Sequence, residues 1–259
     1  MFYELKLFLS DMKDVLIYPD MARKMVAEAC DEMPVDPEIF ARDSLGRTLN
    51  AWYGRSTSER NPTLFPRRVG IPPLVAFDGS KGMVRLYGYG KTGAAILQKN
   101  APLIMTALSR HTKSACRIEE NVGDFKLKLG QPEIFMIRRL VMAKKRTGYD
   151  RFNGTTAVDR ADDVRNAIYD GILSQAYFID EQGGMQNDEF LIGHIPKLES
   201  MRIEVFEGES IGQEIKPGIN ASAYKNVVFA ANLELAGPWM AGKMRSRGNG
   251  FIRKRMSHD

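Results

Sequence analysis

The feature that most constrains the fold is the order of strand-like and helix-like patterns in the first 130 residues. Residues 3–10 alternate apolar and polar side chains with a period of two, which predicts a strand buried on one face. Residues 19–33 place apolar side chains at helical spacing behind Asp20, which is available as a cap. A hairpin, a second helix and more strand material follow at 73–90, 91–111 and 115–130. This order is that of a split βαβ unit.

Two details of this first half are predicted from turn and breaker residues. Asp78-Gly79 and Lys81-Gly82 are typical of hairpin turns, so we expect both pairs in the turn. Pro102 falls inside the second helical pattern, and we expect the helix to be kinked or split there. The whole arrangement predicts a ferredoxin-like domain, an antiparallel sheet covered on one face by two helices.

The pattern restarts in part after Gly130. A strand over 133–145 is followed by a helix over 159–182, and three further strands are expected at 201–218, 225–235 and 251–256. We therefore predict an α+β protein of two tandem ferredoxin-like domains. The first spans 1–130 with an arginine-rich insertion at about 41–73, and the second spans 131–259. The second contains a basic and helical insertion at about 144–185 and a glycine-rich loop at 242–251.

The distribution of charge indicates an anionic partner. Net charge is +5 and the isoelectric point is near 9.1. Six arginines lie between residues 42 and 68 against two acids, and six cations with no acid lie between residues 243 and 255. A third cluster runs from Arg138 to Arg151. Separated basic clusters can each be solvated faces, but three of them favour a nucleic-acid partner.

The loop "GKMRSRGNGF", residues 242–251, combines three glycines with three cations. Glycine permits positive φ and close backbone approach, and successive N–H groups in such a turn form an anion-binding nest. A phosphodiester could lie against Gly242, Gly248 and Gly250 while Lys243, Arg245 and Arg247 neutralise it. The alternative is a β-bulge or hairpin turn with incidental charge.

The chain offers little for metal or redox chemistry. Cys30 and Cys116 are far apart and outside any C-x-x-C spacing, so neither a structural zinc site nor a disulfide framework is expected. The acids are scattered, and we predict no metal and no cofactor. No apolar run approaches the roughly 20 residues that span a bilayer. The expected location is the cytoplasm, without a membrane partner.

Two ferredoxin-like halves with a basic glycine loop before the final strand resemble the RAMP superfamily of CRISPR RNA-binding proteins. The loop is similar to the glycine-rich loop of the repeat-processing endoribonucleases, small-x-x-basic-x-basic-Gly-x-Gly-Phe. The match is specific over about residues 229–254 and architectural elsewhere. The many arginines, and the arginine-rich connection after the first helix, look most like the type IV CRISPR member. In that member the enzyme also stays on its RNA within the effector complex.

The resemblance implies a metal-independent endoribonuclease that binds a CRISPR repeat hairpin and cuts it to mature crRNA. The 2′-hydroxyl attacks the phosphorus and leaves a 2′,3′-cyclic phosphate. Many relatives place a histidine near the end of the first helix, but none occurs here in residues 11–70. Arginines are therefore expected to carry more of the catalysis, with Arg23, Arg245 and Arg247 as candidates. Tyr18 is a possible hydroxyl acid or base, with packing as the simpler explanation.

The remaining basic residues are assigned to RNA binding. The expected partners are CRISPR repeat RNA or a crRNA hairpin and other effector subunits. The cluster after residue 137 could grip an A-form stem, and Trp52, Tyr53 and Phe65 could stack unpaired bases or form small local cores. The candidate RNA-binding residues are Arg42, Arg47, Gly242, Lys243, Gly248, Gly250, Arg138, Arg139, Lys144, Lys145, Arg146 and Arg151.

Two other functions stay open at this point. A non-catalytic RAMP subunit that binds the crRNA end would explain the missing early histidine. A general RNA- or ribosome-associated protein is the third reading, although the aromatic strand signature of a conventional RRM is lacking.

Overall fold

The structure is a computed structural model and describes residues 1–41, 73–143, 154–181, 200–216 and 219–255. Several sequence predictions fall outside these residues. They concern Arg42, Arg47, Trp52, Tyr53, Phe65, Lys144, Lys145, Arg146 and Arg151.

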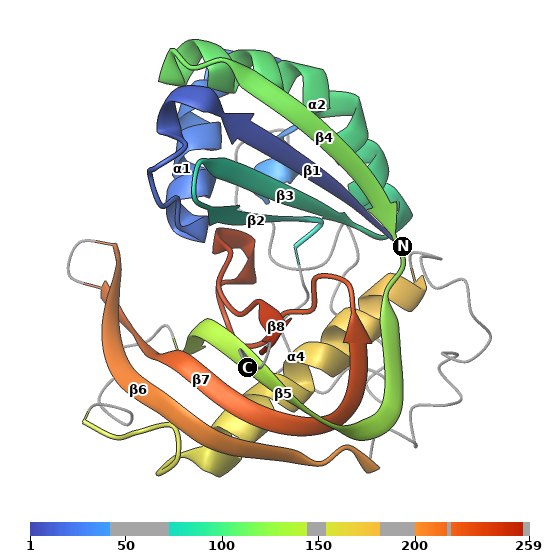
Figure 1. The fold of residues 1–259 in the computed structure, drawn as a ribbon, viewed down its shortest axis with the longest axis vertical. Coiled ribbons are helices and arrows are strands. Elements are labelled where there is room, and N and C mark those ends of the chain that lie inside the picture. Colours follow the sequence, from blue (N-terminus) through green and yellow to red (C-terminus); the bar gives the residue numbers. More distant parts are fainter. Residues whose placement is uncertain (42–72, 144–153, 182–199, 217–218, 256–259) are drawn as a thin grey trace, which may run out of the picture.

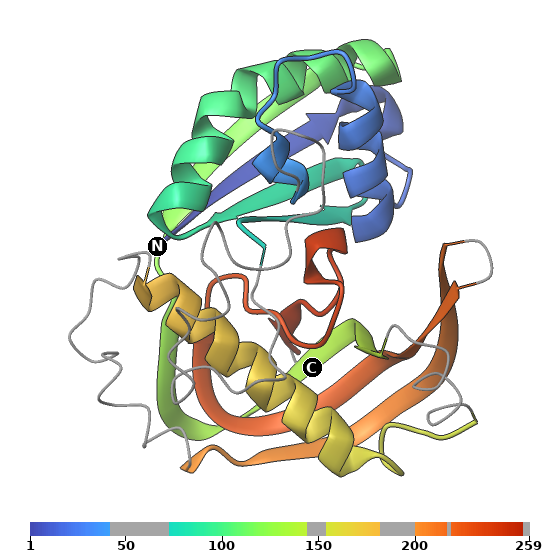
Figure 2. The same cartoon turned by 180° about the vertical axis from the view of Figure 1, so that it is seen from behind.

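The first half of the chain has the predicted element order (Figure 1). Its four strands form one antiparallel sheet in the order β2-β3-β1-β4. Both helices lie on one face of this sheet, as the view from behind shows (Figure 2). The bounds are β1 Phe2–Leu9, α1 Pro19–Ala29, β2 Val75–Ser80, β3 Met83–Tyr89, α2 Gly90–Thr112 and β4 Cys116–Gly123.

Two local predictions in this half were wrong. Asp78 and Gly79 belong to β2, and only Lys81 and Gly82 form the turn. Gly79 sits in the strand because a Cβ there would lie 2.5 Å from the carbonyl oxygen of Ile17. The predicted split of the second helix is also wrong, because α2 runs unbroken through Pro102, whereas the predicted kink there stays a prediction. The apolar face of α2 is buried against the sheet, and this packing outweighs the roughly 3 kcal/mol that an interior proline costs.

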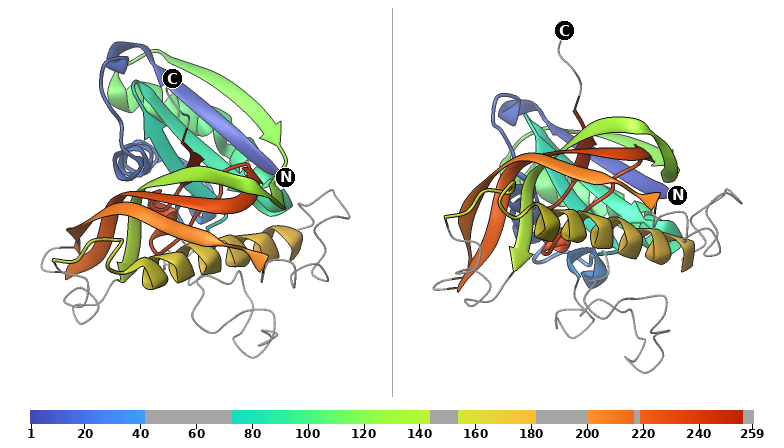
Figure 3. Two further views of the ribbon diagram at one scale, coloured as in Figure 1. Left: turned by 60° about the horizontal axis from the view of Figure 1, so that its bottom comes forward. Right: turned by 90° about the horizontal axis from the view of Figure 1, so that it is seen from below.

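The second half repeats the same sheet with one element exchanged. Its strands follow the order β6-β7-β5-β8, and α4 lies along one face of the sheet (Figure 3). Where the first half has its second helix, the second half has the loop over residues 237–251. The bounds are β5 Lys126–Ala143, α4 Ala161–Glu181, β6 Ile203–Lys216, β7 Ile219–Ala236 and β8 Ile252–Lys254.

The two halves share one apolar core. The chain leaves the first sheet at Gly123 and enters the second at Lys126. Between them, the Phe125 ring packs against Phe2, Tyr89 and Trp239, with centroid distances of 5.3, 5.8 and 5.2 Å. The Tyr89 hydroxyl donates to the carbonyl oxygen of Pro238 (3.0 Å), which joins the first sheet to the glycine-loop segment. This junction positions the surfaces described next.

Candidate functional site

The glycine-rich loop packs against protein on both sides. Its 3₁₀ turn η6 (Arg245–Arg247) contacts β2 and α1 of the first half. A Cβ on Gly248 would lie 2.2 Å from the carbonyl oxygen of Phe77 and 2.3 Å from Pro19 Cβ. A Cβ on Gly250 would lie 1.9 Å from the carbonyl oxygen of Ala241. Both glycines have positive φ, 77° and 92°. These glycines therefore let the loop fit between the two halves.

Arg245 anchors the loop from inside. Its side chain is 5% exposed and donates to Ser174 Oγ (3.0 Å) and to the carbonyl oxygen of Gly171 (3.4 Å), both in α4. Burial lowers the pKa of the Arg245 guanidinium to about 10, while Tyr89 acts to raise it. The group is still charged at neutral pH. Its position favours a role in holding the loop on α4.

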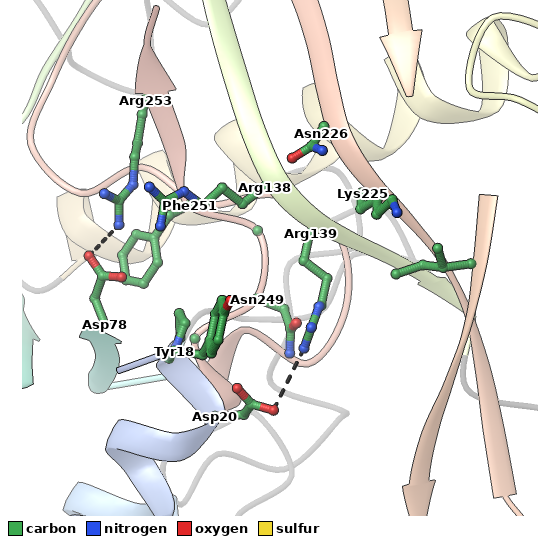
Figure 4. A pocket seen from close by; sticks show the side chains of 14 residues that line it. Tyr18, Asp20, Asp78, Arg138, Arg139, Lys225, Asn226, Asn249, Phe251 and Arg253 are labelled. Atoms are coloured by element: carbon green, nitrogen blue, oxygen red, sulfur yellow. Dashed lines mark hydrogen bonds and ion pairs between the residues drawn. The ribbon is translucent and has the colours of Figure 1, made fainter. Parts of the chain in front are cut away.

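A pocket of about 300 Å³ opens where the loop meets α1, β5 and β7, and we call it the junction pocket (Figure 4). It is hollowed at the contact between the two halves, so each half supplies part of its wall. Its lining is Tyr18, Pro19, Asp20, Asp78, Arg138, Arg139, Ile211, Lys225, Asn226, Gly248, Asn249, Gly250, Phe251 and Arg253.

Strand pairing concentrates positive charge in the junction pocket. Arg139 on β5 lies directly opposite Lys225 on β7 in the antiparallel register. Like charges in directly opposite positions destabilise a sheet, so such a pair needs compensating anions. Lys225 has one in Glu209, at 2.9 Å. Arg138 and Arg253 add two further cations to the lining.

Two acids of the first half pair with arginines of the second half across this pocket. Asp20 Oδ2 lies 3.6 Å from Arg139 Nη1. Asp78 Oδ2 accepts a hydrogen bond from Arg253 and lies 3.7 Å from Arg85 Nη1. Figure 4 shows both contacts bridging the pocket. Each of these two arginines is thus held by an acid of the other half.

Tyr18 contributes a phenol side chain to the lining of the junction pocket. It is the N-cap residue of α1, its side chain is 50% exposed, and Pro19 occupies the first helical position. Its exposure argues against the packing explanation. No histidine lines the pocket among the described residues. His111 lies at the end of α2, 41% exposed and 4.0 Å from Glu28.

The comparisons with known proteins bear on this arrangement. The family model described as type IV CRISPR-associated endonuclease Csf5 matches residues 6–256. The chain belongs to this family.

Solved structures show the same fold. The structure titled "Csf5, CRISPR-Cas type IV Cas6 crRNA endonuclease" is 18% identical, with a TM-score of 0.61 over 98% of this chain and 99% of that chain. A Cas6b crystal structure is 13% identical, with a TM-score of 0.57 over 98% of this chain and 100% of its own. No curated protein sequence matches the chain. These two neighbours bear out the prediction of an α+β fold of two ferredoxin-like units.

Four residues predicted for RNA binding in this Csf5 family member come together in the junction pocket. They are Arg138, Arg139, Gly248 and Gly250. Gly242 faces Leu140 and Val141, and Lys243, Arg245 and Arg247 do not line the pocket. Arg23 is half-buried, does not line the pocket, and donates through Nη2 to the carbonyl oxygen of Phe40 (3.1 Å).

Sequence reasoning missed several of the lining residues. Arg253 was counted in a basic cluster without a role, and Lys225 and Asn226 carried no signal. Asn226 has φ of 52°, a left-handed conformation that asparagine tolerates. Asn249 is 4% exposed and donates to the carbonyl oxygen of Met244 (3.3 Å), which braces the loop.

Two findings concern other site classes. Within the described residues, His, Cys, Asp and Glu side chains nowhere gather in a group of three or more that could hold a metal ion. None of the helices in the described part of the chain is long and apolar enough to cross a membrane.

Proposed function

We propose that the protein is an endoribonuclease that binds CRISPR repeat hairpin RNA and cuts it to mature crRNA at the junction pocket. One observation carries the proposal. One small pocket beside the glycine-rich loop is lined by four cations, Arg138, Arg139, Lys225 and Arg253. The chain that carries this pocket belongs to a CRISPR endonuclease family. Arginine binds phosphate through two parallel N–H groups, so such a pocket suits a phosphodiester.

In the proposed reaction the pocket cations stabilise the negative charge of the transition state. The 2′-hydroxyl upstream of the scissile bond attacks the phosphorus, a P–O bond forms, and the bond to the 5′ oxygen breaks. The products end in a 2′,3′-cyclic phosphate and a 5′-hydroxyl. Charge on the phosphorane increases during the attack, and preorganised donors at that point lower the barrier. The amino end of α1, at Pro19 and Asp20, adds a positive partial charge.

Proton transfer needs a second kind of group. Tyr18 carries an exposed hydroxyl at the pocket, and we assign it the role of general acid or base. Arginine is a poor general base at neutral pH, so the guanidinium groups act electrostatically. Metal independence is part of the proposal, because the guanidinium groups of the pocket supply positive charge to the transition state.

The three arginines first expected in catalysis receive different roles in this proposal. Arg245 positions the loop, because its buried guanidinium donates a hydrogen bond to Ser174 of α4. Arg23 and Arg247 do not line the pocket, and we assign them contacts with the RNA outside it. We also propose that the enzyme stays on its RNA and meets other effector subunits through that complex.

A non-catalytic subunit that binds the crRNA end is the second candidate. The observation that favours it is the lack of a histidine in the described lining of the junction pocket.

The test is cleavage of labelled repeat RNA in excess EDTA, with unrelated RNA as the specificity control. We expect one sharp cut whose upstream product ends in a 2′,3′-cyclic phosphate. Arg139→Ala should lower the single-turnover rate by about 10²- to 10³-fold, as loss of one preorganised donor does. The matched control is Arg117→Ala, because Arg117 is 64% exposed in the first sheet and does not line the pocket. Binding without any cut identifies the non-catalytic subunit, and activity that requires added magnesium rules out the metal-free mechanism.

A further inference from the structure

A second pocket lies behind the junction pocket, on the side of the first sheet that the helices leave open. It has a volume of about 210 Å³. It shares Asp78, Phe251 and Arg253 with the junction pocket. Its lining is Phe2, Glu4, Asp78, Arg85, Tyr87, Gly237, Pro238, Phe251, Ile252 and Arg253.

Aromatic rings form part of the wall. The Tyr87 ring lies 5.6 Å from the Phe251 ring and 6.1 Å from the Phe2 ring, between centroids. The planes are inclined by 55° and 74°. Tyr87 comes from the first sheet and Phe251 from the end of the glycine loop, so the two halves form the wall together. Flat heterocycles stack on such rings, and base stacking on an aromatic side chain is largely independent of sequence.

The polar groups give this pocket a specific pattern. Asp78 is 2% exposed, and its Oδ2 is bound by Arg253 and Arg85. In the described part of the chain nothing donates a hydrogen bond to Asp78 Oδ1. A buried acceptor without a donor is costly, and native proteins rarely leave one. An N–H or O–H group in this pocket, from water or from a ligand, would satisfy the oxygen.

The other acid of the pocket is already satisfied. Glu4 is 7% exposed, with Oε1 at 3.3 Å from Arg85 Nε and Oε2 at 3.4 Å from Lys6 Nζ. The lining thus holds one buried carboxylate oxygen that accepts no hydrogen bond within the described residues, beside two guanidinium groups. A matching ligand has N–H donors on one edge and acceptors on the neighbouring edge.

We propose that this pocket binds a guanine base of the RNA strand next to the phosphate in the junction pocket. Guanine carries N–H donors at N1 and N2 for the carboxylate of Asp78, and acceptors at O6 and N7 that suit arginine. The inference rests on the proposed function, because it assumes that RNA enters the junction pocket. Asp78 and Arg253 then connect base recognition to the cleavage site, since both line both pockets.

The experiment is calorimetric titration of the unmodified protein with the 5′-monophosphates of guanosine, inosine, adenosine, cytidine and uridine. All five share the phosphate, so differences between them report the base. Inosine lacks only the N2 amino group of guanine. We expect the guanosine nucleotide to bind about 5- to 150-fold more tightly than the uridine nucleotide, the range of one well-formed base contact, and the inosine nucleotide to fall between them.

Asp78→Asn should abolish this preference, because it replaces one carboxylate oxygen by a donor. The matched control is Asp14→Asn, an exposed acid paired with Lys81 at 2.9 Å. If Asp78→Asn does not fold, the nucleotide series on the unmodified protein still decides the question. Equal affinities for all five nucleotides overturn the guanine assignment. The cleavage assay in EDTA tests the proposed nuclease separately, so the two failures can be told apart.

Discussion

At the scale of the residue, burial separates two uses of arginine. Arg245 belongs to the basic glycine-rich loop, yet it is 5% exposed and bound to α4. Arg138 is exposed and Arg139 half-buried, and both line the junction pocket. A guanidinium that is bound within the protein has few N–H groups left for phosphate. The pocket arginines are therefore better placed for substrate, and the loop arginine for structure.

Tyr18→Phe tests proton transfer at the pocket. Loss of the hydroxyl should slow single-turnover cleavage by about 10²- to 10⁴-fold, the usual contribution of general acid–base catalysis. RNA affinity should change little, because one hydroxyl is a small part of a large basic interface. His111→Ala is the control and should cleave at the normal rate. The pH–rate profile should lack an inflection near about 6.5, where a histidine titrates. Normal cleavage by Tyr18→Phe would remove Tyr18 from the mechanism.

The site could be predicted only where charge stands out locally. Arg138 and Arg139 interrupt an apolar strand pattern, which marks them from sequence. Lys225 is a single cation in its strand pattern, and Arg253 is the first of three consecutive cations, Arg253 to Arg255. Cations in such strand patterns are ordinarily solvent-facing. Lys225 and Arg253 reach the pocket because β5 pairs with both β7 and β8. Those pairings are long-range, so no local pattern reports them.

At the scale of the element, the glycine-rich loop shows why local composition is ambiguous. Its glycines were predicted to admit a phosphate. In the structure, Gly248 and Gly250 lie within contact distance of Phe77, Pro19 and Ala241. Both requirements call for a residue without a Cβ, so the sequence pattern is the same. The element order, by contrast, could be predicted because the periods of strands and helices are local properties.

Gly250→Ala should destabilise the protein by more than the cost of placing alanine in a positive-φ conformation. The new Cβ would lie 1.9 Å from the carbonyl oxygen of Ala241, which is backbone and cannot move aside cheaply. Gly154→Ala is the matched control, because Gly154 has φ of 72° with nothing within 4 Å of its would-be Cβ. It should cost only about 1–2 kcal/mol, the left-handed penalty. Thermal unfolding of both variants checks this, and equal losses would show that the loop has room at Gly250.

Asn100→Ala should loosen the short helix η2 (Pro37–Phe40), whose Phe40 carbonyl oxygen binds Arg23. Asn100 is 1% exposed, donates to Asp36 Oδ2 (2.8 Å) and accepts from the Asp36 backbone N–H (3.1 Å). We expect a loss of about 1–3 kcal/mol in the free energy of unfolding at neutral pH. The control is Thr106→Ala, because Thr106 lies in α2, as Asn100 does, and makes one exposed hydrogen bond. This change should lower the free energy of unfolding by no more than about 0.5 kcal/mol.

The Asn100 effect should also depend on pH. Hydrogen bonds from Asn100 and then Lys99 lower the pKa of the Asp36 carboxyl. A carboxyl with a lowered folded-state pKa contributes stability above its unfolded value, about 3.9, and loses it as the pH falls through the folded value. Asn100→Ala reduces this contribution. The difference in the free energy of unfolding between the variant and the unmodified protein should therefore become smaller below about pH 4. Denaturant titrations at pH 7 and pH 3 measure this, and a constant difference would contradict the role of Asp36.

At the scale of the whole molecule, the junction between the halves is both core and site. Aromatic rings fill its interior around Phe125, and two acid–arginine pairs close its surface at the pocket. The sequence predicted two halves without indicating how they face each other, because that geometry depends on long-range packing. Since the pocket exists only where the halves meet, their relative placement is a condition for the proposed chemistry.

Phe125→Ala tests whether the halves unfold as one unit. The Phe125 side chain is 6% exposed and contacts rings from both halves, so its removal should cost about 3–5 kcal/mol. At about 2–4 °C for each kcal/mol, the midpoint of thermal unfolding should fall by about 6–20 °C. Far-UV circular dichroism and tryptophan fluorescence should still report one coincident transition, because the core is continuous. Phe206→Ala, at a side chain 43% exposed, is the control and should leave the midpoint nearly unchanged. Two separate transitions, one of them at the original midpoint, would show that each half is stable alone and that the junction pocket can open without unfolding either half.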